Sequence, residues 1–288
     1  MIVLALLLVA LALAWPAPRL LPRVVGLREV PRAGLVLWQC TSLAAVVAGL
    51  AAGPMFRAGT NLLLDHAALR AVAAWLGVGV SLVTLGLLMA SGHRTGMRLR
   101  RLRRRHRELV DLIALEPQTA GAQQLRVLEH ATPTAYCVPG LRQRVVLSQG
   151  TIDALDADEL LAVLAHERAH LRARHDLVLE FFTVLHTAVP RRLRSEAGLA
   201  EVHLLVELLA DRSAAQQAGA EPLARALVEL AGGERPDAAL GAGGSTTLLR
   251  LELLAVARPA RARAFVTYLA AAAVLALPVG LVALGLAV

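Results

Sequence analysis

Three long stretches of the chain contain no charged residue: 33–56, 71–92 and 264–288. They are 24, 22 and 25 residues long, and a helix of that length crosses the hydrocarbon core of a bilayer, which is about 30 Å thick. Hydrophobic residues make up 57 % of the chain and charged residues only 18 %, which is too apolar for a soluble protein of this length. We therefore expect a membrane protein.

Residues 1–18 form one more uncharged stretch, which ends before Arg19. Ala12-Leu-Ala14 resembles a signal-peptide cleavage site, so a cleaved signal peptide is the competing interpretation. The start Met-Ile-Val lacks the basic residues that open a signal peptide, and we favour a short first transmembrane helix. The sequence thus predicts four spans, at about 1–18, 33–56, 71–92 and 264–288.

The placement of arginine predicts the orientation in the membrane. Loop 16–32 has a net charge of +3, loop 57–70 has +1, and residues 93–107 hold eight Arg and no acid. The positive-inside rule then places the first loop and the long segment 93–263 in the cytoplasm. We expect a multi-pass plasma membrane protein with both termini outside.

A sequence pI near 11.1 is also compatible with nucleic-acid binding. Aromatic residues make up only 3 % of the chain, however, which leaves few platforms for base stacking. The arginine run at 93–107 is better explained as a topology determinant that touches anionic headgroups. The expected partner is the lipid bilayer, with no direct nucleic-acid contact. The two cysteines, Cys40 and Cys137, are far apart and predict neither a disulfide nor a metal pair.

His166-Glu167-x-x-His170 is the H-E-x-x-H pattern of zinc-dependent peptidases. On a helix, both imidazoles leave the same face and can bind one Zn²⁺, while Glu167 is close enough to take a proton from water. Asp156 and Glu159 predict a capping box at the start of this helix. An apolar stripe that buries it comes from Leu160, Val163 and Leu164. The alternative is a solvated helix on which the two histidines are incidental.

A third zinc ligand is predicted at Glu207, in Glu207-Leu-Leu-Ala-Asp211. Catalytic zinc keeps three protein ligands, and Glu207 completes this set for one ion per chain. Asp211, one helical turn later, is expected to accept the free N–H of a zinc-bound histidine. The alternative is an exposed Glu207, with Asp211 paired to Arg212.

The remaining histidines in this region receive different predictions. His203 lies one turn before Glu207 and is a candidate stabiliser of an oxyanion opposite the zinc. His175 is five residues beyond His170, which points it off the zinc face and predicts a structural role. His186 lies on an apolar helix, where a core position is expected.

The fold class predicted is mainly α: three transmembrane helices in 1–92, a cytoplasmic α+β zinc peptidase domain in 93–263 and a fourth transmembrane helix in 264–288. The third span is expected to continue into the cytoplasm as an amphipathic helix. Within the domain we expect helical turns in 123–130 and a connection at 232–247. A helix at 176–189 is too short to span the membrane, so it is either buried or interfacial.

A β-hairpin is predicted from residues 134–139 and 144–148, around Pro139-Gly140. A free strand edge beside a zinc helix can bind an extended substrate through main-chain hydrogen bonds. Residues 145–147 are therefore either such an edge or simply core.

The two motifs that begin at His166 and Glu207 together resemble the gluzincin pattern of zinc peptidases. With the hairpin and the domain between spans three and four, the chain is similar to BlaR/MecR-type integral membrane metallopeptidases. That resemblance implies cleavage of a BlaI/MecI-like transcriptional repressor. An extracellular β-lactam sensor follows the fourth span in that family, but this sequence ends at Val288, so we do not expect β-lactam sensing.

HtpX-like quality-control peptidases and CAAX-processing membrane peptidases are similar in the same motifs. They imply other protein substrates, namely misfolded membrane proteins or processed peptides. A non-catalytic receptor or scaffold stabilised by zinc is the remaining alternative.

Overall fold

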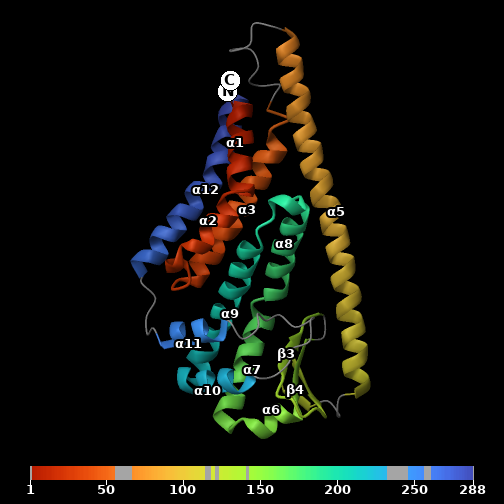
Figure 1. The fold of residues 1–288 in the computed structure, drawn as a ribbon, viewed down its shortest axis with the longest axis vertical. Coiled ribbons are helices and arrows are strands. Elements are labelled where there is room, and N and C mark those ends of the chain that lie inside the picture. The colour runs from red at the N-terminus through yellow and green to blue at the C-terminus, as the bar shows by residue number, and fades with distance from the viewer. Residues whose placement is uncertain are drawn as a thin grey trace. The chain divides into compact units, whose positions relative to one another are not determined.

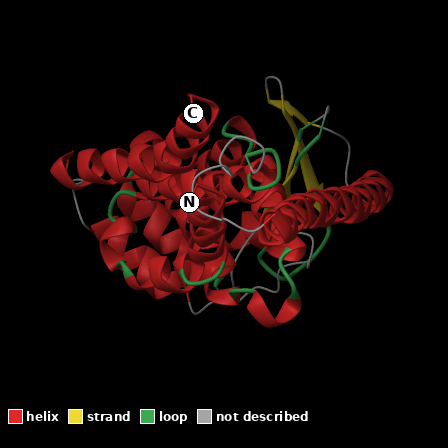
Figure 2. Ribbon diagram, turned by 90° about the horizontal axis from the view of Figure 1, so that it is seen from above, coloured by secondary structure: helices red, strands yellow, loops and turns green. Residues whose placement is uncertain are grey.

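The computed structural model describes residues 2–55, 67–113, 118–120, 123–140, 143–231, 246–255 and 261–287. Most of these residues are helical, and Figure 2 shows a single small group of strands among the helices. The prediction of a mainly α chain that contains a small amount of β structure is confirmed.

The chain divides into two compact units. The first comprises Met1–Arg94, Phe182–Glu201 and Ala260–Val288, and the second comprises Thr95–Phe181 and Val202–Pro259. The segment 182–201 thus belongs to the unit that contains the uncharged stretches, although the sequence gives no sign of this. The assignment of the units as membrane and peptidase domains stays a prediction.

In the first unit, three apolar helices pack together: α1 (Ile2–Ala14), α3 (Pro31–Ala51) and α12 (Arg261–Ala287) (Figure 1). Between α1 and α3 the chain forms α2 (Ala17–Leu20) and two 3₁₀ turns, Leu21–Arg23 and Val25–Leu27. Ile2 packs with Leu281 in one apolar cluster, so the start of α1 and the end of α12 lie together. This arrangement is compatible with two termini on the same side of a membrane.

Helix α5 (Ala67–Ile113) is much longer than a membrane span needs, and it confirms that the third uncharged stretch continues as a helix. Among the described residues, four helical segments are long and apolar enough to cross a membrane: Ile2–Arg23, Pro31–Ala51, Ala74–Val110 and Arg261–Ala287. Large apolar side chains point outward from α5 and α12, among them Trp75, 75 % exposed, and Leu286, 70 % exposed. Such surfaces are stable against lipid, which supports the prediction of a membrane protein.

The second unit contains a four-stranded sheet in the order β1-β2-β4-β3. The strands are β1 (Gln118–Ala120), β2 (Gln123–Leu128), β3 (Ala135–Val138) and β4 (Arg144–Ser148). The prediction of helical turns in 123–130 is wrong, because β2 pairs in parallel with β4 from Gln124↔Arg144 to Leu128↔Ser148. A segment this short has no decisive periodicity of its own, so its partner strand determines its conformation.

The predicted hairpin is confirmed: β3 pairs antiparallel with β4, with Cys137 opposite Val145. Strand β4 lies between β2 and β3, and all five of its residues are buried. Of the two alternatives for residues 145–147, the structure therefore favours a core position over a free edge. Among the described strands, the edge on this side of the sheet belongs to β3.

Helix α7 (Ala157–Arg172) packs against β3 and β4 and against α10 (Ala220–Leu230). Val163 and Leu171 of α7 share a core with Val145 and Leu147 of the sheet. The other helices that follow the sheet are α6 (Gln149–Ala154), α8 (His175–Ala188), α9 (Glu196–Ala218) and α11 (Thr247–Ala255), with a 3₁₀ turn at Arg191–Leu193.

Helix α8 confirms the helix predicted at 176–189, and its Leu179 and Phe182 are buried. Most of the connection predicted at 232–247 lies outside the described residues.

Candidate metal centre

Helix α7 begins at the predicted capping box. The Asp156 side chain accepts a hydrogen bond from the Glu159 backbone N–H (2.8 Å), and the Glu159 carboxylate accepts one from the Asp156 N–H (3.0 Å). Arg225 of α10 donates to the same Glu159 carboxylate (2.8 Å). The capping box fixes the N-terminus of α7, and the packing of its apolar face fixes the rotation of the helix about its axis. The side chains of the two histidines, ten and fourteen residues after the cap, therefore leave the helix in a fixed direction.

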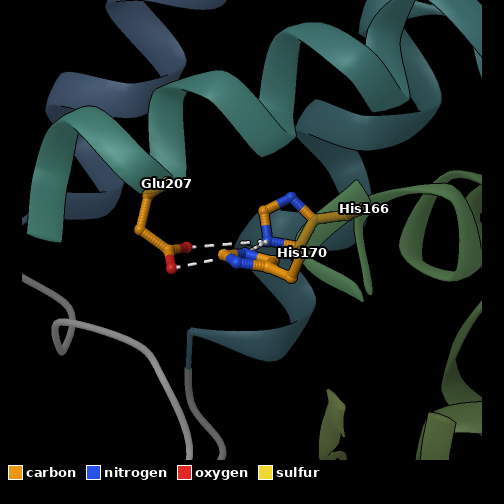
Figure 3. A group of neighbouring side chains, drawn as sticks. All are labelled: His166, His170 and Glu207. Atoms are coloured by element: carbon orange, nitrogen blue, oxygen red, sulfur yellow. Dashed lines mark hydrogen bonds and ion pairs between the residues drawn. The ribbon is translucent and has the colours of Figure 1, made fainter. Parts of the chain in front are cut away.

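His166 and His170 are both buried on the same face of α7, and their Nε2 atoms are 3.1 Å apart. Glu207 comes from α9 and is also buried. Its Oε1 lies 3.5 Å from His170 Nε2, and its Oε2 lies 3.6 Å from His166 Nε2 (Figure 3). The structure thus brings together the three predicted metal ligands, and the alternative of an exposed Glu207 does not hold.

The spacing of these three side chains fits a zinc ion. Two ligand atoms, each 2.0–2.1 Å from a tetrahedral zinc, lie about 3.3–3.4 Å from each other. The contacts of 3.1, 3.5 and 3.6 Å between His166, His170 and Glu207 bracket this value. Two imidazoles and one carboxylate are also a usual donor set for catalytic zinc.

Asp211 lies one turn after Glu207 on α9 and is 1 % exposed. Its Oδ1 is 3.0 Å from Nδ1 of His166, the ring nitrogen that faces away from the other two ligands. A proton on this nitrogen leaves the lone pair of Nε2 free for a metal. The predicted contact is therefore present, and the arginine that donates hydrogen bonds to the Asp211 carboxylate is Arg250.

Arg250 of α11 is the residue that the sequence analysis missed. Its guanidinium donates to both carboxylate oxygens of Asp211, at 2.8 and 2.6 Å, and its Nη1 lies 3.1 Å from Glu207 Oε2. It is 1 % exposed. The sequence does not distinguish this arginine from the other basic residues, of which the chain has 30 in total, because it belongs to no motif with a characteristic spacing. Only its burial between two carboxylates reveals its role.

The buried carboxylates also favour a cation in the site. The side chains of Glu167, Glu207 and Asp211 are all buried, and Arg250 contacts two of them, Glu207 and Asp211. A metal cation bound among these side chains would offset their negative charge. Buried charges that lack such compensation are strongly unfavourable.

The proton affinities follow from these contacts. Burial alone would raise the pKa of Glu207, but His166, His170 and Arg250 hold it well below its usual range. Burial opposes charge on His166 as well, yet the hydrogen bonds to Asp211 and Glu207 raise its pKa to about 9. Burial lowers the pKa of His170 to about 4. Glu207 is thus ionised, and His170 is neutral, the form in which an imidazole binds zinc.

Two more histidines lie near this cluster. His203 is partly buried on α9, one turn before Glu207, and its burial lowers its pKa, so its ring is neutral at pH 7. It stays a candidate oxyanion stabiliser. His175, expected to point away from the zinc face, instead lies with its Nδ1 3.0 Å from Nδ1 of His170. Burial lowers the pKa of His175 to about 4.

Glu167 is buried on α7, and Cys137 of β3 hydrogen-bonds to it. Burial is the main reason that the pKa of the Cys137 thiol is well above its ordinary value, and the nearby Glu167 carboxylate raises it further. Both described cysteines are free thiols. The thiol therefore reports on the charge of Glu167.

Replacing Glu167 with Gln is expected to speed the alkylation of Cys137 several-fold at pH 8 in the zinc-free protein. Removing the carboxylate charge lowers the pKa of the thiol, so the reactive thiolate becomes more abundant at a given pH. Iodoacetamide labelling in a Cys40→Ser background, followed by mass spectrometry, measures this rate. An unchanged rate across pH 7 to 9 would mean that Glu167 and Cys137 are not in contact.

The sequence that contains this cluster is similar to a known protein family. The sequence profile of Peptidase family M48 matches residues 97–269, which is more than half of the chain and includes every residue of the cluster. The chain belongs to peptidase family M48. Metallopeptidases of this family use zinc in general, so the assignment supports the prediction of a metallopeptidase and accords with the His-His-Glu group.

One solved structure similar to this M48 chain is the crystal structure of Ste24p from S. mikatae, at 15 % sequence identity and a TM-score of 0.32. The match covers 84 % of this chain and 65 % of the Ste24p chain. No curated protein matches the sequence. The narrower resemblance to BlaR/MecR-type peptidases stays a prediction.

Proposed function

We propose that this M48 chain is a membrane-anchored zinc endopeptidase in which His166, His170 and Glu207 hold one zinc ion. The observation that carries the proposal is the convergence of these three buried side chains at the spacing of zinc ligands. Asp211 would orient His166, and Arg250 would keep Asp211 and Glu207 in place.

The chemistry would be hydrolysis of a peptide bond. A zinc ion held by these ligands would lower the pKa of water towards about 7 and polarise the scissile carbonyl. Glu167 directly follows His166 on α7. Its carboxylate would take the proton from the attacking water and deliver it to the leaving amine. The neutral ring of His203 can donate an N–H to the developing oxyanion.

Strand β3 is the proposed docking site for the substrate backbone. The backbone N–H of Ser148 donates to the carbonyl oxygen of Thr134, so residues 134 and 148 form a hydrogen-bonded pair of the antiparallel ladder. Because such pairs alternate with non-hydrogen-bonded pairs, the backbone N–H and C=O groups of Ala135 and Cys137 point away from β4. Cys137 also contacts Glu167, so this edge runs beside the proposed base. An extended peptide added to β3 would bring its carbonyl to the metal centre.

The arginine distribution supports a cytoplasmic position for the peptidase unit, with the helices in the plasma membrane and both termini outside. Two substrate classes fit: a specific cytoplasmic protein such as a BlaI/MecI-like repressor, or misfolded membrane proteins as in HtpX-like quality control. Comparing the proteomes of cells that make the wild type or Glu167→Gln separates them. Accumulation of one protein favours the first class, and accumulation of many unfolded membrane proteins favours the second.

Purified wild type is expected to contain one zinc per chain, and His166→Ala close to none. The reason is that a site reduced to two ligands holds zinc far more weakly. Inductively coupled plasma mass spectrometry after gel filtration measures the content. His203→Ala is the matched control: it removes an imidazole from the same region and should retain the zinc. Equal zinc in wild type and His166→Ala would contradict the metal centre. Zinc without any cleavage would favour the scaffold alternative.

A further inference from the structure

We propose that His175 is a positioning residue for the metal centre, which accepts the Nδ1–H of His170 as Asp211 accepts that of His166. This inference rests on the proposed function, because it assumes that His170 binds zinc. It assigns a role to a residue that no motif marks and that helical geometry would direct away from the site.

The direction of the hydrogen bond follows from the ring nitrogens. His170 Nε2 faces the other ligands, at 3.1 Å from His166 Nε2 and 3.5 Å from Glu207 Oε1. A metal on Nε2 needs the lone pair of that nitrogen, so the proton of the neutral ring is on Nδ1. The atom opposite, at 3.0 Å, is Nδ1 of His175, which must then present a lone pair and carry its own proton on Nε2.

Burial makes this acceptor important. His170 and His175 are both 3 % exposed, so bulk water has little access to the His170 N–H. A buried donor without a partner carries a desolvation penalty, and a ring without a fixed tautomer is a poorer ligand. The two rings also meet nearly at right angles, at 86° with centroids 4.8 Å apart, which fixes the plane of His170.

The turn between α7 and α8 is what brings His175 back to the site. Helix α7 ends at Arg172, and Arg174 has a positive φ of 51°. Arginine rarely adopts this left-handed conformation, which persists where the surrounding structure requires it. The Arg174 Nε lies 3.4 Å from Asp176 Oδ1, across His175 in the sequence. A continuous helix would have pointed His175 elsewhere.

The two zinc-binding imidazoles therefore have different hydrogen-bond acceptors at Nδ1. His166 faces a carboxylate that Arg250 holds with two hydrogen bonds, whereas His170 faces a neutral ring. A carboxylate acceptor raises ligand basicity more than a neutral one does. The hydrogen-bond acceptors at the two Nδ1 atoms thus fix the tautomers of both rings.

A pair of isosteric variants tests this role. In His175→Asn, Oδ1 takes the place of Nδ1 and can accept the proton, whereas His175→Leu has the same shape as Asn but no acceptor. We expect His175→Leu to bind zinc about 10–100-fold more weakly than the wild type, and His175→Asn to recover most of that loss. Competition with a chromogenic chelator measures the affinity. The visible spectrum of the Co²⁺-substituted proteins reports the ligand geometry.

Thermal unfolding of the zinc-free proteins is the control for stability, because both variants remove the same ring. A purely structural role for His175 predicts equal zinc affinity in the Asn and Leu variants, and that result would overturn the inference. Absence of zinc from the wild type would instead overturn the proposed function. The two failures are therefore distinguishable.

Discussion

Replacing Glu167 with Gln is expected to slow peptide cleavage by about 10²–10⁴-fold, the usual contribution of a general base, while zinc content is unchanged. Gln has the size of Glu and can still hydrogen-bond, but its amide cannot accept the proton of the attacking water. Glu167 is not one of the three clustered ligand residues, so the zinc should remain. The measurement is the cleavage rate of a reporter protein in detergent, with zinc quantified in the same samples.

Glu159→Gln is the matched control for this variant. Glu159 is another buried glutamate of α7, located in the capping box two turns before the metal cluster. Gln is compatible with a capping box, so we expect near wild-type cleavage. Full activity in Glu167→Gln would remove Glu167 from the mechanism, and loss of zinc in that variant would make it part of the metal site instead.

Replacing Arg250 with Met is expected to destabilise the zinc-free protein by about 3–5 kcal/mol, because the substitution leaves buried carboxylates without their partner. Arg250 is 1 % exposed, and its contacts with Asp211 and Glu207 raise its pKa despite that burial. Zinc binding should recover part of the loss, since the dication supplies positive charge at the same place. Denaturant unfolding in detergent, with and without a chelator, measures both effects.

Arg225→Met provides the comparison for Arg250. Arg225 contacts three carboxylates, one more than Arg250, but its side chain is 46 % exposed; the three belong to Asp156, Glu159 and Glu221. Solvent screens such a network, so its loss should be much less destabilising and insensitive to zinc. Equal destabilisation by the two substitutions would contradict the assignment of Arg250 to the metal centre.

The sequence by itself determined those features that depend on helical periodicity. The positions of His166 and His170, of Glu207 and Asp211, and of the capping box at Asp156 all depend on spacings of three or four residues. Every α-helix has the same number of residues per turn, so the sequence alone predicts which of these side chains share a face. The uncharged stretches were predictable for a similar reason, because the length of a span depends only on rise per residue.

The tertiary structure alone decided which residues from distant segments meet. Arg250 lies 39 positions after Asp211, and Cys137 lies 30 before Glu167, so no local pattern could pair them. The strand at 123–128 and the central place of β4 depend on pairing between strands, and His175 reaches His170 only because Arg174 leaves the helical conformation. Long-range packing and one left-handed backbone angle thus complete a site whose predicted ligands could be identified from the sequence.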